Sequence, residues 1–228
     1  MGLDAIVSYD DTDNDIDALA LGRLLRAAGA RLTLAYVRHA THRAPLDEEA
    51  SQRDAEALLK RGAARLGDAG VARRVLVSAS TGEGLGWLAE RDRFDLIVFG
   101  SEYRARPGRV CIGRSAQALL DGGPAALALA PSGFAARPAC EIASVGVLHG
   151  TADEAAIETA FTIAERLRGT VVDRDRDVDL LIVGSRPQAP EGRLTVAATA
   201  LNAIEDSACP VLAVARGTAL EFPSLAPV

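Results

Sequence analysis

A length of 228 residues is enough for two modest α/β units, and 49% hydrophobic with 25% charged residues is ordinary globular usage. The formal net charge of −6 gives no basic field for nucleic acid or for an anionic membrane, and 4% aromatic residues leave few platforms for stacking bases. We therefore expect no nucleic-acid partner and no membrane partner.

Cysteine usage points to a reducing compartment. The three cysteines, Cys111, Cys140 and Cys209, form no Cys-x-x-Cys pair, and their number is odd, so neither a disulfide framework nor a zinc site is expected. Acidic residues at positions 4, 10 and 11 argue against a secretory signal, and no apolar run approaches the ~20 residues that span a bilayer. We expect a cytoplasmic protein.

Hydrophobic periodicity predicts alternating strands and helices over the first 130 residues. Short apolar runs indicate buried strands, and apolar residues three or four positions apart, preceded by capping residues such as Ser80, indicate helices. Because such strands pair in parallel through right-handed crossovers, we expect a doubly wound open sheet of five parallel strands. The expected elements are strands at 3–10, 31–37, 71–79, 95–100 and 125–130, and helices at about 16–28, 48–68, 84–92 and 114–121.

The second half of the chain repeats part of the first. Residues 94–133 align with residues 178–217 without a gap, at an offset of 84, and the order of strand, loop, helix and strand recurs. The shared residues include the pairs Asp95/Asp179, Leu96/Leu180, Gly100/Gly184, Ser101/Ser185, Gly108/Gly192, Arg109/Arg193 and Gly133/Gly217.

The second copy is shorter than the first. Residues 9–12 align with residues 148–151 at an offset of 139, so the two offsets differ by 55 residues. The deletion removes the counterparts of the second helix, third strand and third helix, although residues 170–173 can form a vestigial second strand. We expect two domains, 1–133 and 138–228, the second with a parallel sheet of four strands or fewer and one face partly bare.

The last strand of each copy carries no charge. As free edges, the apolar runs at 125–130 and 211–215 would be liable to aggregate, so we predict that they pair antiparallel in an intrachain pseudo-twofold dimer. The bare face requires cover from the first copy, from a second chain, or from the tail residues Leu220, Phe222 and Leu225. Because a small domain buries little by itself, we also expect a homodimer.

Several segments together resemble the universal stress protein family. Residues 100–103 and 113–115 (Gly-Ser-Glu-Tyr and Gly-Arg-Ser) follow a strand that ends in Ile-Val-Phe, and residues 7–10 end the first strand with Val-Ser-Tyr-Asp. Residues 184–186 and 209–214 resemble the family again in the second copy. The resemblance covers nearly the whole chain and implies an adenine nucleotide alpha hydrolase-like fold, as a tandem form with a truncated second domain.

In that family the loop after the fourth strand holds the phosphates of ATP. Its pattern is glycine, two residues, glycine, nine residues, glycine, then serine or threonine, and backbone N–H groups of such a loop point at the anion. Gly100 and Gly113 have the required spacing, but Tyr103 replaces the middle glycine and Arg114 the hydroxyl residue, with Ser115 one place late. A tyrosine at a positive-φ position would be strained, and we expect its bulk to fill the groove.

The resemblance implies two further contacts with the nucleotide, Asp10 near the adenosine and Val37 beside the adenine. Arginines of the same loop can either bind phosphate through their side chains or simply be solvated. These arginines are Arg104, Arg106, Arg109 and Arg114. The candidate nucleotide-binding residues are therefore Asp10, Val37, Gly100, Gly113, Arg114 and Ser115, with ATP as the possible cofactor of the first domain.

The second copy departs further from the family pattern. It keeps Gly184, but Pro187, Ala197 and Ala198 occupy the other three motif positions, and proline lacks the N–H donor. His149 aligns with the position of the first copy's aspartate. We expect no nucleotide in this copy.

No residue is predicted to be catalytic, and no metal site is expected. His39 and His42 share a loop, but no acid or cysteine stands at a recognised spacing from them, so a solvated loop is favoured over a metal or acid–base site. Cys111 lies between Val110 and Ile112 and is expected to be half-buried rather than a reactive thiolate. The common catalytic motifs are missing from the sequence.

The leading hypothesis is a non-catalytic stress-response or regulatory module with degenerate nucleotide binding, which acts on an unknown regulatory protein partner. The alternative is an ATP-binding switch with slow hydrolysis at the first domain. A third and more distant reading is an adenine-binding subunit similar to an electron-transfer flavoprotein.

Overall fold

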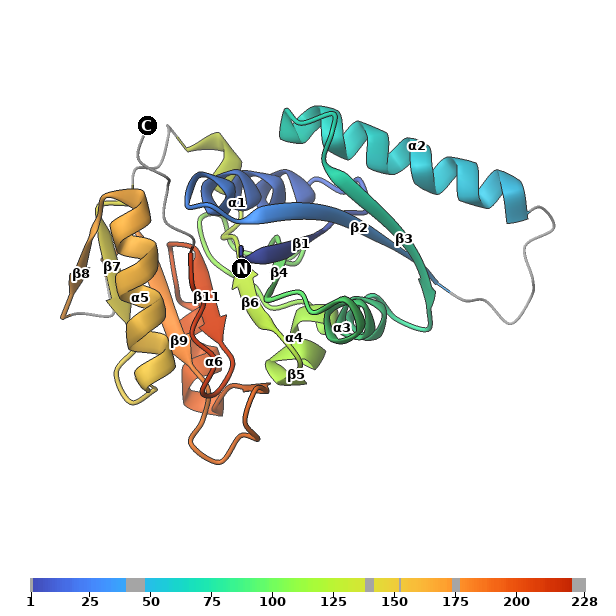
Figure 1. The fold of residues 1–228 in the computed structure, drawn as a ribbon. Coiled ribbons are helices and arrows are strands. Elements are labelled where there is room, and N and C mark those ends of the chain that lie inside the picture. Colours follow the sequence, from blue (N-terminus) through green and yellow to red (C-terminus); the bar gives the residue numbers. More distant parts are fainter. Residues whose placement is uncertain (1, 40–47, 138–141, 152, 174–176, 223–228) are drawn as a thin grey trace.

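The computed structural model describes residues 2–39, 48–137, 142–151, 153–173 and 177–222 (Figure 1). Its helices and strands are, in chain order, β1 (Asp4–Ser8), α1 (Asp15–Ala27), β2 (Arg31–His39), α2 (Glu48–Leu66), β3 (Ala72–Ser78), α3 (Thr81–Asp92), β4 (Leu96–Phe99), α4 (Arg114–Leu120), β5 (Asp121–Gly123), β6 (Ala126–Leu129), the 3-10 turn η1 (Phe134–Ala136), β7 (Ser144–Val147), α5 (Glu154–Leu167), β8 (Thr170–Val172), β9 (Leu180–Gly184), β10 (Leu194–Thr195), α6 (Ala198–Glu205) and β11 (Val211–Val214).

One nine-stranded sheet runs through both halves, in the order β3-β2-β1-β4-β6-β11-β9-β7-β8. The five strands from β3 to β6 pair in parallel, as predicted, and so do the four strands from β11 to β8. Figure 1 shows the two sets of strands side by side. The α/β fold with a mostly parallel sheet is therefore confirmed, and β4, β6 and β11 are short apolar strands that are buried along their whole length.

The two halves meet at β6 and β11, which pair antiparallel. Ala128 lies opposite Leu212, and Leu127 lies opposite Ala213. Since Ala128 and Leu212 are also related by the repeat offset of 84, a local twofold axis passes between them. The predicted pairing of the two last strands is confirmed.

Helices cover both faces of the sheet. One core layer contains side chains of α1, α2 and α5, including Leu21, Leu59 and Ile163. The other contains side chains of α3, α4 and α6, including Leu88 and Ile204. No helix in the described part of the chain is long and apolar enough to cross a membrane.

Strand register shows how the second half relates to the first. Ile97 pairs with Leu127 and Leu181 pairs with Val211, so this part keeps the offset of 84. Val7 pairs with Val98, whereas Val147 pairs with Ile182, which places the upstream offset at 140. The predicted offset of 139 is therefore wrong by one residue. By register, His149 corresponds to Tyr9, and Gly150 corresponds to Asp10.

The second half contributes four parallel strands to this sheet, within the predicted limit of four, and β8 is the short second strand expected at 170–173. Residues 218–222 of the tail cover part of the sheet face on which α5 lies. Leu220 and Phe222 are buried in the core beside α5. The Leu220 N–H donates to Thr159 Oγ1 at 2.9 Å, and Thr162 Oγ1 donates to the Leu220 carbonyl at 2.9 Å. Leu225 lies outside the described residues.

Two short strands were missed by the sequence analysis. β5 follows α4 and pairs antiparallel with β10 of the other half, and the Val196 N–H donates to the Leu120 carbonyl at 3.0 Å. Neither strand has the length or the alternation that marks a strand in sequence, because both form only where the halves cross. The Ser80 cap is confirmed, since its Oγ accepts from the Glu83 N–H at 3.2 Å.

We predict that the two halves unfold as one cooperative unit. Ile182 of β9 is fully buried, so Ile182→Ala is expected to lower the free energy of unfolding by about 2–5 kcal/mol. Trp87, the single tryptophan, lies in α3 of the first half. Its fluorescence transition in denaturant should move with the mutation. The exposed Asn202→Ala is the control, and an unchanged Trp87 transition in Ile182→Ala would contradict a shared sheet.

Candidate functional site

The predicted nucleotide residues lie at the carboxyl ends of the parallel strands, where ligands bind in open α/β sheets. Asp10 follows β1, Val37 lies two residues before the end of β2, and Gly100 follows β4. The structure packs two of these loops directly together, because a Cβ on Gly100 would lie 2.1 Å from the Asn14 carbonyl oxygen. Glycine at this position is explained by close backbone packing.

The loop between β1 and α1 is held by a carboxylate of its own. Asp15, in the first turn of α1, is buried and accepts from the Asp10 N–H at 2.8 Å and from the Thr12 N–H at 3.0 Å. These are N–H groups at the carboxyl edge of a strand, which is where a doubly wound sheet offers donors to an anionic ligand. The side chain of Asp15 occupies them.

Burial is the main cause that raises the pKa of Asp15 to about 7. The side-chain hydrogen bond and the charge of Asp10 raise it further, while the two backbone N–H donors act in the opposite direction. The sequence analysis did not single out this residue. An acid in the first helical turn directly after a buried strand was the signal that could have singled it out.

A second acid of this loop ties it to α2. Asp11 has a positive φ of 67° and forms ion pairs with Arg61 at 2.7 Å and with Arg65 at 3.2 Å. The Tyr9 hydroxyl donates to Asp11 at 2.7 Å. The hydrogen bonds from Tyr9 and Arg61 hold the pKa of Asp11 below its usual value, so it stays ionised.

The loop between β4 and α4 also uses its backbone donors internally. The Cys111 N–H donates to Ser101 Oγ at 3.1 Å, and Ser101 Oγ donates to the Ala130 carbonyl at 2.7 Å. The Glu102 N–H donates to the Cys111 carbonyl at 3.0 Å, and the Arg104 N–H donates to the Glu102 carboxylate at 2.9 Å. The loop is thus a closed, self-bonded structure.

Tyr103 does not fill a groove. Its side chain is 70% exposed, it is not among the residues with positive φ, and the Arg104 guanidinium lies 5.0 Å from its ring centre. The expectation of a strained, groove-filling tyrosine was wrong. The loop turns through Glu102 and Ala105 instead, where the Ala105 N–H donates to the Glu102 carbonyl at 2.9 Å.

The other predicted residues also have structural contacts. Gly113 precedes α4 with extended backbone, and the Glu102 side chain lies 3.5 Å from the position of a Cβ there. A Cβ on Gly82 would lie 2.8 Å from the Ser115 carbonyl, so α3 packs on the start of α4. The Val37 side chain is buried against Gly84 of α3.

Arg114 is exposed at the start of α4. The remaining loop arginines, Arg104, Arg106 and Arg109, line a cavity shared with the second half. The Arg109 guanidinium donates to the Asp206 carbonyl. The predicted arginine cluster is therefore divided between two places.

Cys111 is half-buried, as expected, and burial, followed by the charges of Glu205 and Glu102, raises the pKa of its thiol. His39 lies 3.1 Å from Thr81 Oγ1, while His42 and Cys140 lie outside the described residues. Among the described side chains, no group of three His, Cys, Asp or Glu residues is arranged to hold a metal ion.

The second half repeats this loop architecture. Thr195 donates its N–H to Ser185 Oγ at 3.1 Å, and Ser185 Oγ donates to the Val214 carbonyl at 2.9 Å, as Cys111, Ser101 and Ala130 do in the first half. A Cβ on Gly184 would lie 2.0 Å from the Thr151 carbonyl. The same pair of hydrogen bonds, centred on a serine hydroxyl, therefore closes both loops.

We predict that Asp15 gives the protein a measurable pH dependence. Its pKa is about 7 when folded and near its ordinary 3.8 when unfolded, so the folded state binds the extra proton and its contribution to stability falls as pH rises from about 4 to about 7. In Asp15→Asn this fall should be absent from denaturation curves, and the exposed Asp13→Asn should keep it. Equal pH profiles for the wild type and Asp15→Asn would refute the assignment.

Comparison with known proteins places the chain. The family model described as the universal stress protein family matches residues 6–131. A universal stress protein from Archaeoglobus fulgidus shares the fold with a TM-score of 0.73 at 14% identity, covering 94% of this chain and 98% of that one. A putative universal stress protein from Pseudomonas aeruginosa gives a TM-score of 0.58 at 12% identity, with 92% of each chain covered. No curated protein matches significantly. Since the family model spans more than half of the chain, the chain belongs to the universal stress protein family.

Proposed function

We propose that this chain is a non-catalytic universal stress protein that acts by binding a regulatory partner, and that its first-half nucleotide site is degenerate. The observation that carries the proposal is that backbone N–H groups of the two loops already donate hydrogen bonds to acceptors within the protein. Asp15 occupies N–H groups after β1, and Glu102, Ser101 and the Cys111 carbonyl occupy N–H groups after β4.

ATP would bind poorly to such a site for two reasons. Its phosphates would have to displace hydrogen bonds that carboxylates already make, each contributing about 1.5–3 kcal/mol. The phosphates would also approach the carboxylate of Glu102, and like charges repel. Arg114 is an exposed cation at this edge, but a single solvated arginine offsets little of that repulsion.

We propose further that the second half is a truncated copy of the same domain. The shared strand register at an offset of 84 and the equivalent hydrogen bonds of the Ser101 and Ser185 hydroxyls support this. We propose a role in binding and a cytoplasmic location for both halves.

We expect calorimetric titration with ATP and Mg²⁺ to show no binding tighter than roughly 1 mM, a free energy near −4 kcal/mol. Glu102→Gln keeps an oxygen acceptor for the Arg104 N–H while removing one negative charge. Glu102→Gln is therefore the matched variant. Its dissociation constant for ATP should stay above roughly 0.1 mM, because the backbone N–H donors of the loop remain hydrogen-bonded within the protein. ATP carried through purification, or a micromolar dissociation constant for the wild type, would contradict the proposal and favour the ATP-binding switch.

We also propose that two chains associate through α5. Ile157 and Phe161 lie one helical turn apart on α5 and are 42% and 59% exposed. In the first half, α2 covers the outer side of α1, where the Arg23 guanidinium donates to the Arg65 carbonyl at 3.2 Å. The described residues of the second half include no helix in the corresponding place. Pairing of two α5 helices would bury both apolar side chains.

The expected mass in solution is about twice the chain mass of 23.8 kDa. Phe161→Glu should shift light-scattering or sedimentation mass toward one chain, because two carboxylates would face one another at the interface. The exposed Glu158→Gln on the same helix is the control. A wild-type protein that sediments as a single chain at micromolar concentration would refute this pairing.

A further inference from the structure

Two cavities lie at equivalent places in the two halves. The first, of about 320 Å³, is lined by the end of α3, the start of β6 and the β9–α6 loop. The second, of about 880 Å³, is lined by the β4–α4 loop, the end of α6 and the start of β9. Lining residues correspond at the repeat offset of 84 in the pairs Arg93/Asp177, Phe94/Val178, Pro124/Ala208, Ala125/Cys209 and Arg193/Arg109.

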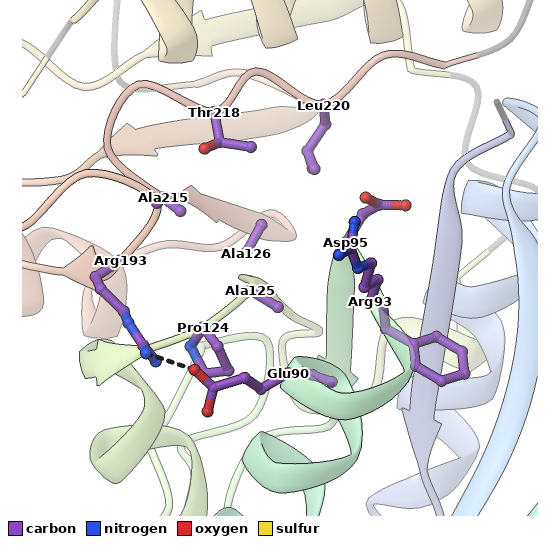
Figure 2. A pocket seen from close by; sticks show the side chains of 13 residues that line it. Glu90, Arg93, Asp95, Pro124, Ala125, Ala126, Arg193, Ala215, Thr218 and Leu220 are labelled. Atoms are coloured by element: carbon purple, nitrogen blue, oxygen red, sulfur yellow. Dashed lines mark hydrogen bonds and ion pairs between the residues drawn. The ribbon is translucent and has the colours of Figure 1, made fainter.

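The first half shows what fills this place. Figure 2 shows Glu90 of α3 reaching Arg193, which comes from the loop of the opposite half, and their side chains form an ion pair at 2.5 Å. Along the same helix, a Cβ on Gly86 would lie 3.2 Å from the Leu119 side chain of α4. An amphipathic helix thus packs on α4 and pairs a carboxylate with the crossing arginine.

The second half lacks a described counterpart of α3. Ala203 of α6 corresponds to the buried Leu119 of α4 but is only half-buried, and Thr199 corresponds to the half-buried Ser115 but is exposed. Arg109, the counterpart of Arg193, is exposed and donates to a backbone carbonyl instead of a carboxylate. α3 lines the first cavity through Ala89 and Glu90, whereas no described helix takes that place beside the second cavity.

We infer that the second cavity binds an amphipathic helix of a partner protein, which carries a carboxylate that pairs with Arg109. This inference rests on the proposed function, since it assigns the surface through which a partner would be bound. Charge favours this occupant. Arg104, Arg106 and Arg109 line the cavity together with the acidic residues Asp177, Glu205 and Asp206. A helix with both signs of charge complements this lining, and α3 itself carries Glu90 and Arg91 and is followed by its C-cap residue Arg93.

The sequence of α3 therefore supplies the probe. A labelled peptide with residues 80–93 is titrated into the full chain and followed by fluorescence anisotropy. Because a short peptide must become helical as it binds, we expect a dissociation constant of about 10–100 µM. Arg109→Glu should weaken binding roughly tenfold, since like charges would then meet. Arg53→Glu on the exposed side of α2 is the matched control and should change nothing.

A charge exchange tests the contact itself. A peptide with Glu90→Arg should bind Arg109→Glu more tightly than it binds the wild type, an outcome that displacement of the protein's own α3 from Arg193 would not give. Ala203→Arg, which places a bulky side chain on the α6 wall, should also reduce binding of the original peptide. If the melting temperature shows that Arg109→Glu does not fold, the peptide affinity of Ala203→Arg tests the inference in its place.

Equal binding of the original peptide to wild type, Arg109→Glu and Ala203→Arg would overturn the inference, as would no binding to the wild type at millimolar peptide. Either result would leave the ATP titration unaffected, and with it the proposal of a degenerate nucleotide site. Micromolar ATP binding would overturn the proposed function whatever the peptide does.

Discussion

The antiparallel pairing of β6 with β11 is the constraint on which the rest of the structure depends. It joins five parallel strands to four in one sheet and hides two apolar edges that would otherwise be open to aggregation. The twofold relation at Ala128 and Leu212 brings each half's loop across the other, so that β5 meets β10 and the Val110 N–H reaches the Ser207 carbonyl at 3.1 Å. The remaining edges are β8, which has three residues, and β3, which carries Arg73 and Arg74.

This crossing explains why the β4–α4 loop has a structural role. The loop contacts the opposite half through the Val110 N–H and closes on itself through Ser101. The described residues of the second half include no counterpart of α3 to meet Arg109 and no counterpart of α2 to cover α5. Ile157 and Phe161 are exposed on α5. The proposed loss of nucleotide binding and the proposed surfaces for protein partners would both follow from this one rearrangement.

The sequence predicted the architecture better than the site. Strand runs, helical periodicity and the gapless repeat predicted the parallel order and the β6–β11 pairing, because buried strands and uncharged edges leave a clear pattern. The position of Tyr103 was wrong, since a one-dimensional motif does not show that Glu102 closes the turn first. Asp15 was missed because its partners, the N–H groups of Asp10 and Thr12, are backbone groups. The upstream alignment slipped by one residue where the copies share few identities, and only register corrected it.

Native-state hydrogen exchange at the β6–β11 junction tests the central claim most directly. Ala126 and Ala130 direct their N–H groups to β4, so by alternation Leu127 and Leu129 direct theirs to β11. If this pairing unites the halves, these two amides exchange only through global unfolding, with protection equal to that of the central strand β1. Exchange of Leu127 and Leu129 by a lower-energy opening, while Ile6 and Val7 of β1 stay protected, would show that the halves separate on their own and would contradict the account.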